Sequence, residues 1–549
     1  MPRYIIGIDT GGTYTDAVLI DQKTGQVLTT SKQPTTHRKL ETGTGRALAN
    51  LINDGGIDVK NIALISVSST LATNSIIENK GARVGVIVIG YVKHFKLPVK
   101  VVAYVKGGHD IHGKEEEPLD IEYLTTLIAK LKNEVDVYGV CSAMSIKNPD
   151  HELVVERAID LIDPKPVFSS HKISQLTGMR ERAATAALHA RLMPVMEEFV
   201  AGVVGAMRNL HIDCPMVIVA GNGKPLVATK VVEEAGLTVA SGPACTAFFG
   251  AAQTDMAENR LVIDVGGTTT DIAMIVNRRV ELAREGCQIG LWKTHIEAVD
   301  MQTVGIGGDS HVLVDDKGLL SIGPARVNPL SMEKDPHPPQ QWLGKGNKSK
   351  LIILHPESKQ LSGDGDLNDL LRATGHLTPA TIRARTGLSG PPLDAQLQHL
   401  TRNQHIYECG FTPTDALHVL DFIAIGNKAM AEEGAEILGW AMGLDGTSFA
   451  KLVIKHTEEL IENLIIDYVI TKYWQNSLAN FIATRKDHPV LDVNFLLKIP
   501  LVGVGAAAPY LLPRVAEKLG TTVIFPQNHE VGNGVGAAII GQSFIDSGR

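Results

Sequence analysis

Short apolar runs separated by glycine-containing turns mark the first part of the chain. An isoleucine-rich run at residues 4–8 predicts a strand, and the pattern then predicts a helix near 41–53, a strand at 62–67, a helix at 73–80 and a strand at 83–89. β-branched residues favour strands, and short apolar runs bounded by turn residues are typical of buried ones. This alternation predicts an α/β fold.

The rest of the chain continues this pattern with longer helices. In order, we expect a helix-rich stretch at 175–210, a strand at 215–220, a Gly-Pro turn at 241–244, long helices across 427–484, a strand, glycine turn and helix at 498–513, and a last helix from Val531. Strand patterns are short and helix patterns long, so segment length separates the two.

Two segments in the middle of the chain depart from the pattern. Residues 324–360 are rich in Pro, Lys, Gln and Gly and predict a long surface loop. Residues 377–410 predict a small helical module that resembles a helix-turn-helix. DNA-binding proteins depend on many Lys and Arg contacts to phosphate, and this module has few basic residues. We therefore interpret it as a structural insertion.

The strongest internal signal is a repeat. YIIGIDTGGTYTDAVLI at residues 4–20 is echoed by RLVIDVGGTTTDIAMIV at 260–276, and both copies contain D-x-G-G-T-x-T-D. Each copy has an apolar run, a Gly-Gly turn and a second apolar run, which is the pattern of a β-hairpin. The two hairpins predict two lobes facing one cleft, with residues 1–185 in the first lobe and 186–549 in the second.

The repeated turns have the composition of a phosphate site. Glycine exposes backbone N–H groups and allows close approach of an anion, and threonine hydroxyls can bond phosphate oxygens. The candidate phosphate ligands are Gly11, Gly12, Thr13, Thr15, Gly266, Gly267, Thr268 and Thr270. Asp9 and Asp264 end the first strand of each hairpin and are candidate ligands of hydrated Mg²⁺. Asp16 and Asp271 either have a direct role in the phosphate site or accept hydrogen bonds from the amides of the turn.

A second glycine-rich segment suits the rest of a nucleotide. GVGAAAPYL at residues 503–511 combines a strand, a glycine turn and a helix start, and it precedes GNGVGAA at 532–538. Small residues let a flat base and a ribose approach the backbone. Gly503 and Gly505 are therefore candidate adenosine contacts.

Bulk composition narrows the class of protein. A chain of 549 residues exceeds what one hydrophobic core usually serves, so two large lobes are expected. The net charge of −8, with basic residues spread along the chain, disfavours nucleic acid and anionic membranes as partners. Its five cysteines are widely separated and form no disulfide framework, and no signal peptide or membrane span is evident. A cytoplasmic location is expected.

The motifs together resemble a known family. The paired D-x-G-G-T hairpins are similar to those of the actin, Hsp70 and sugar-kinase ATPases, which implies a two-lobed, ribonuclease H-like ATPase fold with a helical insertion. The opening GIDTGGTYTDAVLID resembles the first motif of the hydantoinase/oxoprolinase family, specifically its ATP-binding A-type subunit. Further segments continue in the family's order at residues 68–91, 180–194, 241–244, 262–272 and 411–420.

The resemblance also has departures. The family's GAGGGS reads GIGGDS at residues 305–310, so Asp309 stands where glycine is expected, and His189 replaces an asparagine of the mid-chain motif. These departures concern the substrate more than ATP binding. Asp309 is a candidate catalytic acid or base beside Asp9 and Asp264, with a surface or turn role as the alternative.

The resemblance implies chemistry in which ATP phosphorylates a cyclic amide or carbonyl oxygen. It implies a small cyclic-amide substrate and either a B-type partner subunit or a homo-oligomer. The first hypothesis is an ATP-dependent hydrolase that opens a cyclic amide or imide. The second is a small-molecule kinase or a subunit of an ATP-dependent carboxylase. The third is a regulatory ATPase without catalysis on a second substrate, in which nucleotide state sets partner binding.

Overall fold

The computed structural model of the chain forms two compact units, each described here by itself. Unit 1 comprises Met1–Asp255, Ile275–Asp300 and Val531–Arg549, and unit 2 comprises Met256–Met274 and Met301–Glu530. Residue 185, the predicted boundary between the lobes, lies inside the helix Met179–Asn209 of unit 1. The chain passes between the two units more than once. The structure describes residues 3–11, 14–35, 40–77, 81–90, 93–172, 176–253, 256–283, 286–289, 292–333, 337–355, 358, 366–402, 405–474, 478–485 and 493–548.

The first hairpin lies at the centre of a six-stranded sheet in unit 1. The strand order is β10-β9-β4-β1-β2-β3. Their bounds are β1 Tyr4–Thr10, β2 Tyr14–Asp21, β3 Val27–Pro34, β4 Ile62–Ser69, β9 Met216–Val219 and β10 Pro225–Val227. β1 runs antiparallel to β2 and parallel to β4, which places Asp9 between Asp16 and Ser68.

Helices cover both faces of this sheet because successive side chains of a strand point to opposite faces. Ile6 and Ile8 join the hydrophobic cluster that includes residues of α1 (Leu40–Gly55) and α5 (Met179–Asn209). On the other face Gly7 lies against α15 (Gly532–Asp546), which also packs on α6 (Ser241–Ala251). The predicted strand–helix alternation is confirmed here.

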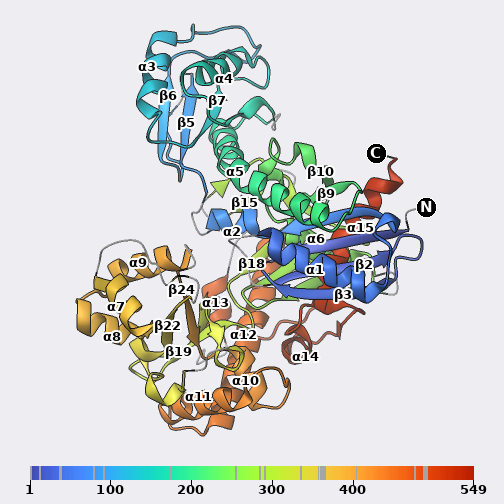
Figure 1. Cartoon of the computed structure of the whole chain (residues 1–549), viewed down its shortest axis with the longest axis vertical. Coiled ribbons are helices and arrows are strands. Elements are labelled where there is room, and N and C mark those ends of the chain that lie inside the picture. The colour runs from blue at the N-terminus through green and yellow to red at the C-terminus, as the bar shows by residue number, and fades with distance from the viewer. Residues whose placement is uncertain are drawn as a thin grey trace. The chain divides into compact units, whose positions relative to one another are not determined.

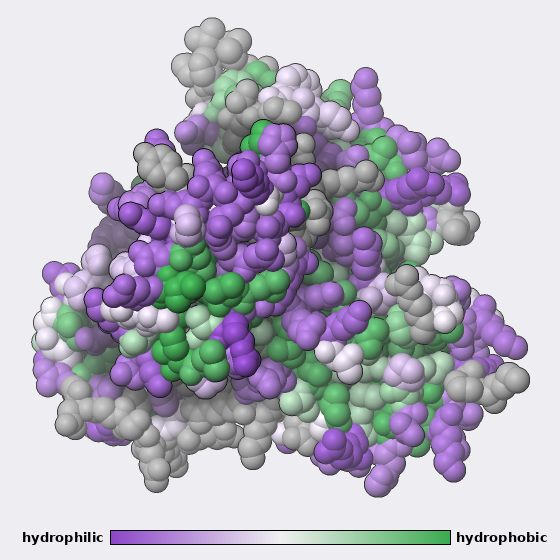
Figure 2. All heavy atoms as spheres, turned by 90° about the horizontal axis from the view of Figure 1, so that it is seen from above, coloured by the Kyte–Doolittle hydropathy of each residue, from purple (hydrophilic) through white to green (hydrophobic). Residues whose placement is uncertain are grey.

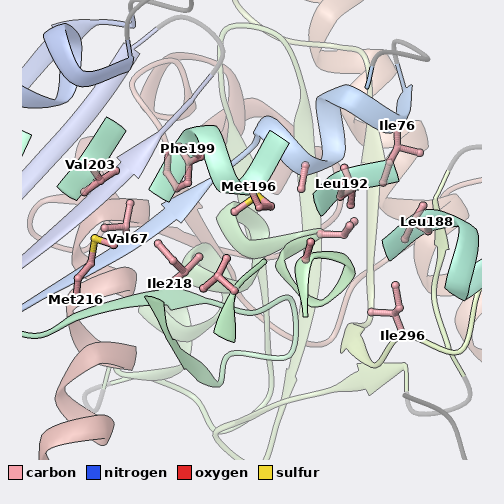
Figure 3. Close-up of a cluster of buried hydrophobic side chains, with 14 of the residues drawn as sticks. Val67, Ile76, Leu188, Leu192, Met196, Phe199, Val203, Met216, Ile218 and Ile296 are labelled. Carbon is pink, nitrogen blue, oxygen red and sulfur yellow. The ribbon is translucent and has the colours of Figure 1, made fainter. Parts of the chain in front are cut away.

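Helix α5 contributes much of the core of unit 1. Residues 182–192 of this helix are all buried, and from Leu192 on the buried apolar side chains recur every three or four residues along one face. Figure 3 shows this face, with side chains from β4, β9 and α2 (Leu71–Ile77) gathered against it. The labelled residues on α5 are Leu188, Leu192, Met196, Phe199 and Val203.

A second sheet of unit 1 is entirely parallel, with the order β6-β5-β7-β8. The strands are β5 Val84–Ile89, β6 Val101–Val105, β7 Val137–Ser142 and β8 Val167–Ser169, with helices α3 Ile121–Leu131 and α4 Asp150–Ile162. In Figure 1 these helices lie beside β5, β6 and β7. The two central strands are buried along their whole length, as expected for a parallel sheet.

The second hairpin belongs to the main sheet of unit 2. Its strands pair in the order β18-β12-β11-β25-β26. The bounds are β11 Arg260–Val265, β12 Thr270–Val276, β18 Met301–Val304, β25 Leu501–Val504 and β26 Val523–Ile524. The helices are α10 Pro413–Val419, α11 Lys428–Trp440, α12 Gly446–Trp474, α13 Ala479–Thr484 and α14 Ala508–Lys518. The predicted helices across 427–484 are confirmed.

Short strands complete the two units. In unit 1, pairs form between β14 Leu282–Ala283 and β17 Ala298–Val299, and between β15 Gln288–Ile289 and β16 Trp292–Lys293, while β13 Arg279–Val280 pairs with the end of β12. In unit 2, β19 Ser310–Val314 pairs with β20 Leu320–Arg326.

The segments predicted as a long loop at 324–360 and a helical insertion at 377–410 belong to a small α/β module within unit 2. A four-stranded sheet has the order β21-β24-β22-β23, with bounds β21 Asn328–Pro329, β22 Lys350–Leu354, β23 His376–Leu377 and β24 Ile406–Gly410. Helices α7 Asp366–Thr374, α8 Pro379–Thr386 and α9 Pro391–Arg402 surround it, as Figure 1 shows. The expected loop at 324–360 is therefore wrong where β21 and β22 form, because strands of two to five residues leave no periodic signal.

The predicted Gly-Pro turn at 241–244 is also wrong. These residues form the first turn of α6, preceded by Ala240 in the left-handed region with φ 62°. Proline is tolerated in a first helical turn because its missing N–H would have no partner inside the helix.

The surface is mixed in character. On the face drawn in Figure 2, hydrophilic residues predominate and hydrophobic residues gather in patches. Within the described ranges, no helix combines the length and the apolar character needed to cross a bilayer.

Candidate functional site

The two hairpin turns share one hydrogen-bond pattern. In the first, the Gly11 amide donates to the Tyr14 carbonyl at 2.9 Å, and in the second the Gly266 amide donates to the Thr269 carbonyl at 3.0 Å. These four residues occupy matching places in the sequence repeat. The repeat in the sequence is therefore also a repeat in the structure. Gly12 and Thr13 of the first turn lie outside the described residues.

Asp9 is a buried carboxylate held by two other elements of unit 1. Ser68 Oγ on β4 donates to Asp9 Oδ1 at 2.6 Å, and Asn533 Nδ2 on α15 donates to Oδ2 at 3.4 Å. Only 5% of Asp9 is exposed. Thr246 on α6 in turn donates to the Asn533 side-chain oxygen. The hydrogen bonds fix the direction of the carboxylate at the end of β1.

Close packing of backbone brings α15 and α6 to this carboxylate. A Cβ on Gly7 would lie 2.0 Å from the Gly534 carbonyl oxygen, and one on Gly536 would lie 2.0 Å from the Cys245 carbonyl oxygen. No side chain fits at such distances. The glycines of GNGVGAA therefore serve helix packing in unit 1. Ser241 at the start of α6 donates its hydroxyl to the Ser69 carbonyl at 2.8 Å.

Asp16 and Thr15 on β2 have partners within the hairpin's own sheet. Lys32 Nζ lies 3.1 Å from Asp16 Oδ1. Burial raises the pKa of Asp16, and Lys32 opposes that shift. The Thr15 hydroxyl is buried and lies 3.1 Å from the Thr35 hydroxyl. These contacts favour a structural role for both side chains.

The turn of the second hairpin is clamped by the loop at residues 305–310. The amide of Gly308 donates to the Gly266 carbonyl at 3.0 Å, and the amide of Asp309 donates to the Gly267 carbonyl at 2.7 Å. A Cβ on Gly307 would lie 2.5 Å from the Gly267 carbonyl oxygen, so this approach requires glycine. The Thr270 hydroxyl donates to the Ile306 carbonyl at 2.7 Å and is committed to the same loop.

This clamp determines where the turn's donors point. In a trans peptide the C=O and the following N–H point in opposite directions. The carbonyls of Gly266 and Gly267 point at the loop, so the amides of Gly267 and Thr268 point away from it. Both residues are exposed, and in the described part of the chain neither amide donates to another group. Consecutive amides that point the same way are typical of anion-binding nests, and we refer to this pair as the nest.

Asp309 lies beside this nest. A Cβ on Gly267 would be 2.6 Å from Asp309 Oδ2, and Arg326 Nη2 lies 3.3 Å from the same oxygen. Burial raises the pKa of Asp309, and the Arg326 guanidinium opposes the shift. The carboxylate is paired and partly exposed, which keeps it a candidate acid or base. Sequence inspection missed Arg326 because no motif contains it.

The glycines of GVGAAAPYL have separate tasks. Gly505 has φ 91°, and a Cβ there would lie 2.8 Å from Asp264 Oδ1. Gly505 therefore lets the turn after β25 pass the buried Asp264, which is 8% exposed. A Cβ on Gly503 would lie 2.3 Å from the Phe525 ring. Ring packing accounts for Gly503, whereas Gly505 lies at the hairpin.

The segment FTPTDALHVL positions the clamping loop. The Thr414 amide donates to the Gly308 carbonyl at 2.8 Å. Asp415 forms a capping box with Thr412 and also accepts hydrogen bonds from the amides of Leu330 and Ser331. The T-x-x-D spacing is a sequence signal for such a cap.

Asp415→Ala is expected to lower the free energy of unfolding by about 3 kcal/mol, because it leaves several buried donors without their acceptor. Asp445→Ala removes an exposed cap on Ser448 and is the matched control, with a smaller loss expected. Urea denaturation measures both. Equal losses in the two variants would contradict the structural role given to Asp415.

Cys245 is packed inside unit 1. It is fully buried in α6, and burial raises the pKa of its thiol, with Asp9 adding to the shift. A protonated thiol is a poor nucleophile. The site's chemistry therefore rests on carboxylates and backbone amides.

Comparison with known proteins places this site in a family. The family description "Hydantoinase/oxoprolinase N-terminal region" matches residues 5–162, and "Hydantoinase/oxoprolinase" matches residues 182–540. The chain belongs to the hydantoinase/oxoprolinase family. The resemblance inferred from the motifs is thus confirmed.

Relatives of this family member include enzyme subunits. Caprolactamase subunit alpha of Pseudomonas jessenii is 25% identical over 369 residues, covering 60% of this chain and 51% of the relative. Acetophenone carboxylase gamma subunit of Aromatoleum aromaticum is 28% identical over 366 residues, covering 58% and 49%. The chain thus spans about half the length of these two curated relatives.

A solved structure supports the fold. Nucleotide-free acetone carboxylase, described as carrying out ATP-dependent acetone carboxylation, superposes with a TM-score of 0.70 at 16% identity, covering 98% of this chain and 70% of that chain. The predicted α/β ATPase fold of this hydantoinase/oxoprolinase family member is confirmed.

Proposed function

We propose that this hydantoinase/oxoprolinase family member binds ATP and Mg²⁺ and uses the γ-phosphoryl group to open a cyclic amide by hydrolysis. The observation that carries the proposal is the clamped second hairpin, whose Gly267 and Thr268 amides point outward as an anion nest. The first hairpin repeats the D-x-G-G-T-x-T-D sequence, and its Gly11 amide makes the matching bond to the Tyr14 carbonyl. Because Gly267 and Thr268 are exposed, their amides are accessible to an incoming anion.

The carboxylates fit a magnesium ion. Mg²⁺ is usually held by one or two carboxylates together with substrate phosphates and water, not by an all-protein cage. The described residues contain no group of three or more His, Cys, Asp or Glu able to hold a metal, and each hairpin ends its first strand in one buried Asp. We propose Asp9 in unit 1 and Asp264 in unit 2 each as a magnesium ligand of its own hairpin. The ion would neutralise charge on the transferring phosphoryl group.

Phosphorylation of the amide oxygen overcomes the low reactivity of an amide toward water. The amide oxygen attacks the γ-phosphorus, and ADP leaves. Water then adds to the carbon, and the ring nitrogen leaves as an amine, which gives an acyl phosphate. A second water attacks the acyl carbon and releases phosphate. Asp309, partly exposed beside the nest, is the candidate that moves a proton during these steps.

The substrate class follows from the relatives. Caprolactamase subunit alpha is named for a lactam, and we extend that class to this chain as a lactam, imide or hydantoin. Both curated relatives are named as subunits of larger enzymes. A B-type partner subunit is therefore proposed, with a homo-oligomer as the alternative. We also propose a cytoplasmic location, where ATP is available, and no role for nucleic acid or membrane.

We expect ATP hydrolysis to be stimulated by a cyclic amide. Caprolactam, 5-oxoproline and hydantoin are tested with and without a B-type subunit, while phosphate and ring-opened product are measured together. Equal amounts of the two products support the proposal. Phosphate release that is insensitive to every cyclic amide, with ATP still bound tightly, would contradict it and favour the regulatory ATPase.

A carboxylase function is the second candidate. It is favoured by the likeness to the acetophenone carboxylase gamma subunit. Adding bicarbonate with acetophenone or acetone to the same assay separates the two functions. Phosphate release that requires bicarbonate and a ketone would assign a carboxylase, and product that accumulates without bicarbonate would assign the hydrolase. A small-molecule kinase would accumulate a phosphorylated product without ring opening.

A further inference from the structure

The inserted α/β module contains a cavity of its own. Its volume is about 590 Å³, and it lies among the turns at 339–348, the strands β22 and β23, the end of α7 and helix α8. Sites for small molecules in proteins are typically 300–1,000 Å³ in volume. The cavity shares no lining residue with either hairpin, so its occupant is distinct from the proposed ATP.

Part of the cavity's lining is apolar. Trp342, Leu343, Leu351 and Leu377 line it, and each is less than 10% exposed. The indole is fixed, because Trp342 Nε1 donates to the His337 carbonyl at 3.1 Å. A rigid aromatic wall beside leucines suits a flat or apolar group on a ligand.

Two cationic side chains reach the same cavity from different elements. Lys348 ends the short turn Gly346–Lys348, and Arg385 lies on α8. The lining includes no Asp or Glu, and within the described residues neither cation forms an ion pair. The position of Lys348 is defined, because the Gly344 amide donates to its carbonyl at 2.9 Å. Both side chains are exposed, and two positive charges beside apolar side chains favour an anion.

The remaining polar lining residues carry no carboxylate, but the Glu433 carboxylate, outside the lining, accepts from the Gln340 amide at 3.0 Å. His376 lines the cavity and packs against His337, with ring centroids 4.1 Å apart and ring planes tilted by 37°. Burial lowers the pKa of His376, and His337 lowers it further. Gln340 and Gln341 also line the cavity. The chemistry is therefore that of a site for a charged headgroup joined to an apolar body.

We propose that this cavity binds a small organic anion, a carboxylate or phosphate carried on an apolar or aromatic group. Lys348 and Arg385 pair with the anionic headgroup, and Trp342 with the neighbouring leucines contacts the apolar part. The inference goes beyond the proposed ATP-dependent reaction and does not depend on it.

Benzoate and phenyl phosphate are the probes, and benzyl alcohol is their neutral counterpart. Binding to the full chain is followed by saturation-transfer NMR and by tryptophan fluorescence. We expect saturable binding of at least one anion, with a Kd of about 1 mM or tighter, and no saturable binding of benzyl alcohol. The ratio of the two anion affinities tells whether a carboxylate or a phosphate headgroup is preferred.

The double variant Lys348→Gln with Arg385→Gln is expected to weaken binding of the better anion about tenfold or more. Its matched control is Lys345→Gln with Arg383→Gln, which removes the same charge from the same two segments outside the lining. Melting temperatures verify that both variants fold. The proposal is overturned if neither anion binds, if benzyl alcohol binds equally well, or if the control double variant loses as much affinity.

Discussion

Asp9→Asn and Asp264→Asn are each expected to lower ATP turnover by about 100-fold or more while the protein stays folded. Both carboxylates are buried at the ends of matching strands, and a carboxylate that positions Mg²⁺ against a transferring phosphate acts mainly in the transition state. Asparagine keeps the size of the side chain but removes the charge. Steady-state phosphate release at saturating ATP and Mg²⁺ measures the loss.

The matched control is Asp315→Asn. Asp315 accepts hydrogen bonds from the Lys317 and Leu319 amides in a turn of unit 2 and belongs to neither hairpin. Its turnover should match that of the unaltered protein. If both hairpin variants retain normal turnover, Asp9 and Asp264 are not magnesium ligands.

Gly307→Ala is expected to raise the KM for ATP by about tenfold or more. A Cβ at this position would lie 2.5 Å from the Gly267 carbonyl oxygen and 2.6 Å from that of Gly266, so the loop must move off the turn. The amides of Gly267 and Thr268 would then lose their fixed direction. Preorganised donors contribute more to anion binding than donors that must reorient.

Gly344→Ala tests whether any glycine replacement in unit 2 has this effect. A Cβ on Gly344 meets only an ordinary contact, 3.5 Å from Lys348, and a normal KM for ATP is expected. Melting temperatures distinguish loss of the nest from loss of the fold. A Gly307→Ala protein with an unchanged KM would show that the clamp does not orient the phosphate donors.

The hairpins were predictable from the sequence because several of their determinants are local. Apolar runs and the doubled D-x-G-G-T pattern identified β1, β2, β11 and β12, and the matching bonds of Gly11 and Gly266 confirm the repeat. Helices α11 and α12 were predicted because their apolar periodicity is long. Recognising these hairpins and helices in the sequence required no knowledge of contacts between distant residues.

The partners of the site residues were not predictable in the same way. Asn533 is 524 positions from Asp9, and only the packing of Gly534 on Gly7 brings them together. Arg326, the last residue of β20, meets Asp309 in the loop before β19, and no motif relates the two positions. Thr15 and Thr270 resembled phosphate ligands in the repeat, yet both hydroxyls bond within the protein. Identical residues at matching positions of a motif do not establish which side chains face a ligand.

Transfer of an oxygen isotope tests the central claim most directly. A cyclic amide that stimulates ATP hydrolysis is prepared with ¹⁸O in its carbonyl group and turned over in ordinary water. If the amide oxygen attacks ATP and the acyl phosphate is split at carbon, each phosphate released carries one oxygen from the amide, and the carboxylate product carries none. Phosphate free of ¹⁸O, with the label retained in the carboxylate, would contradict this account.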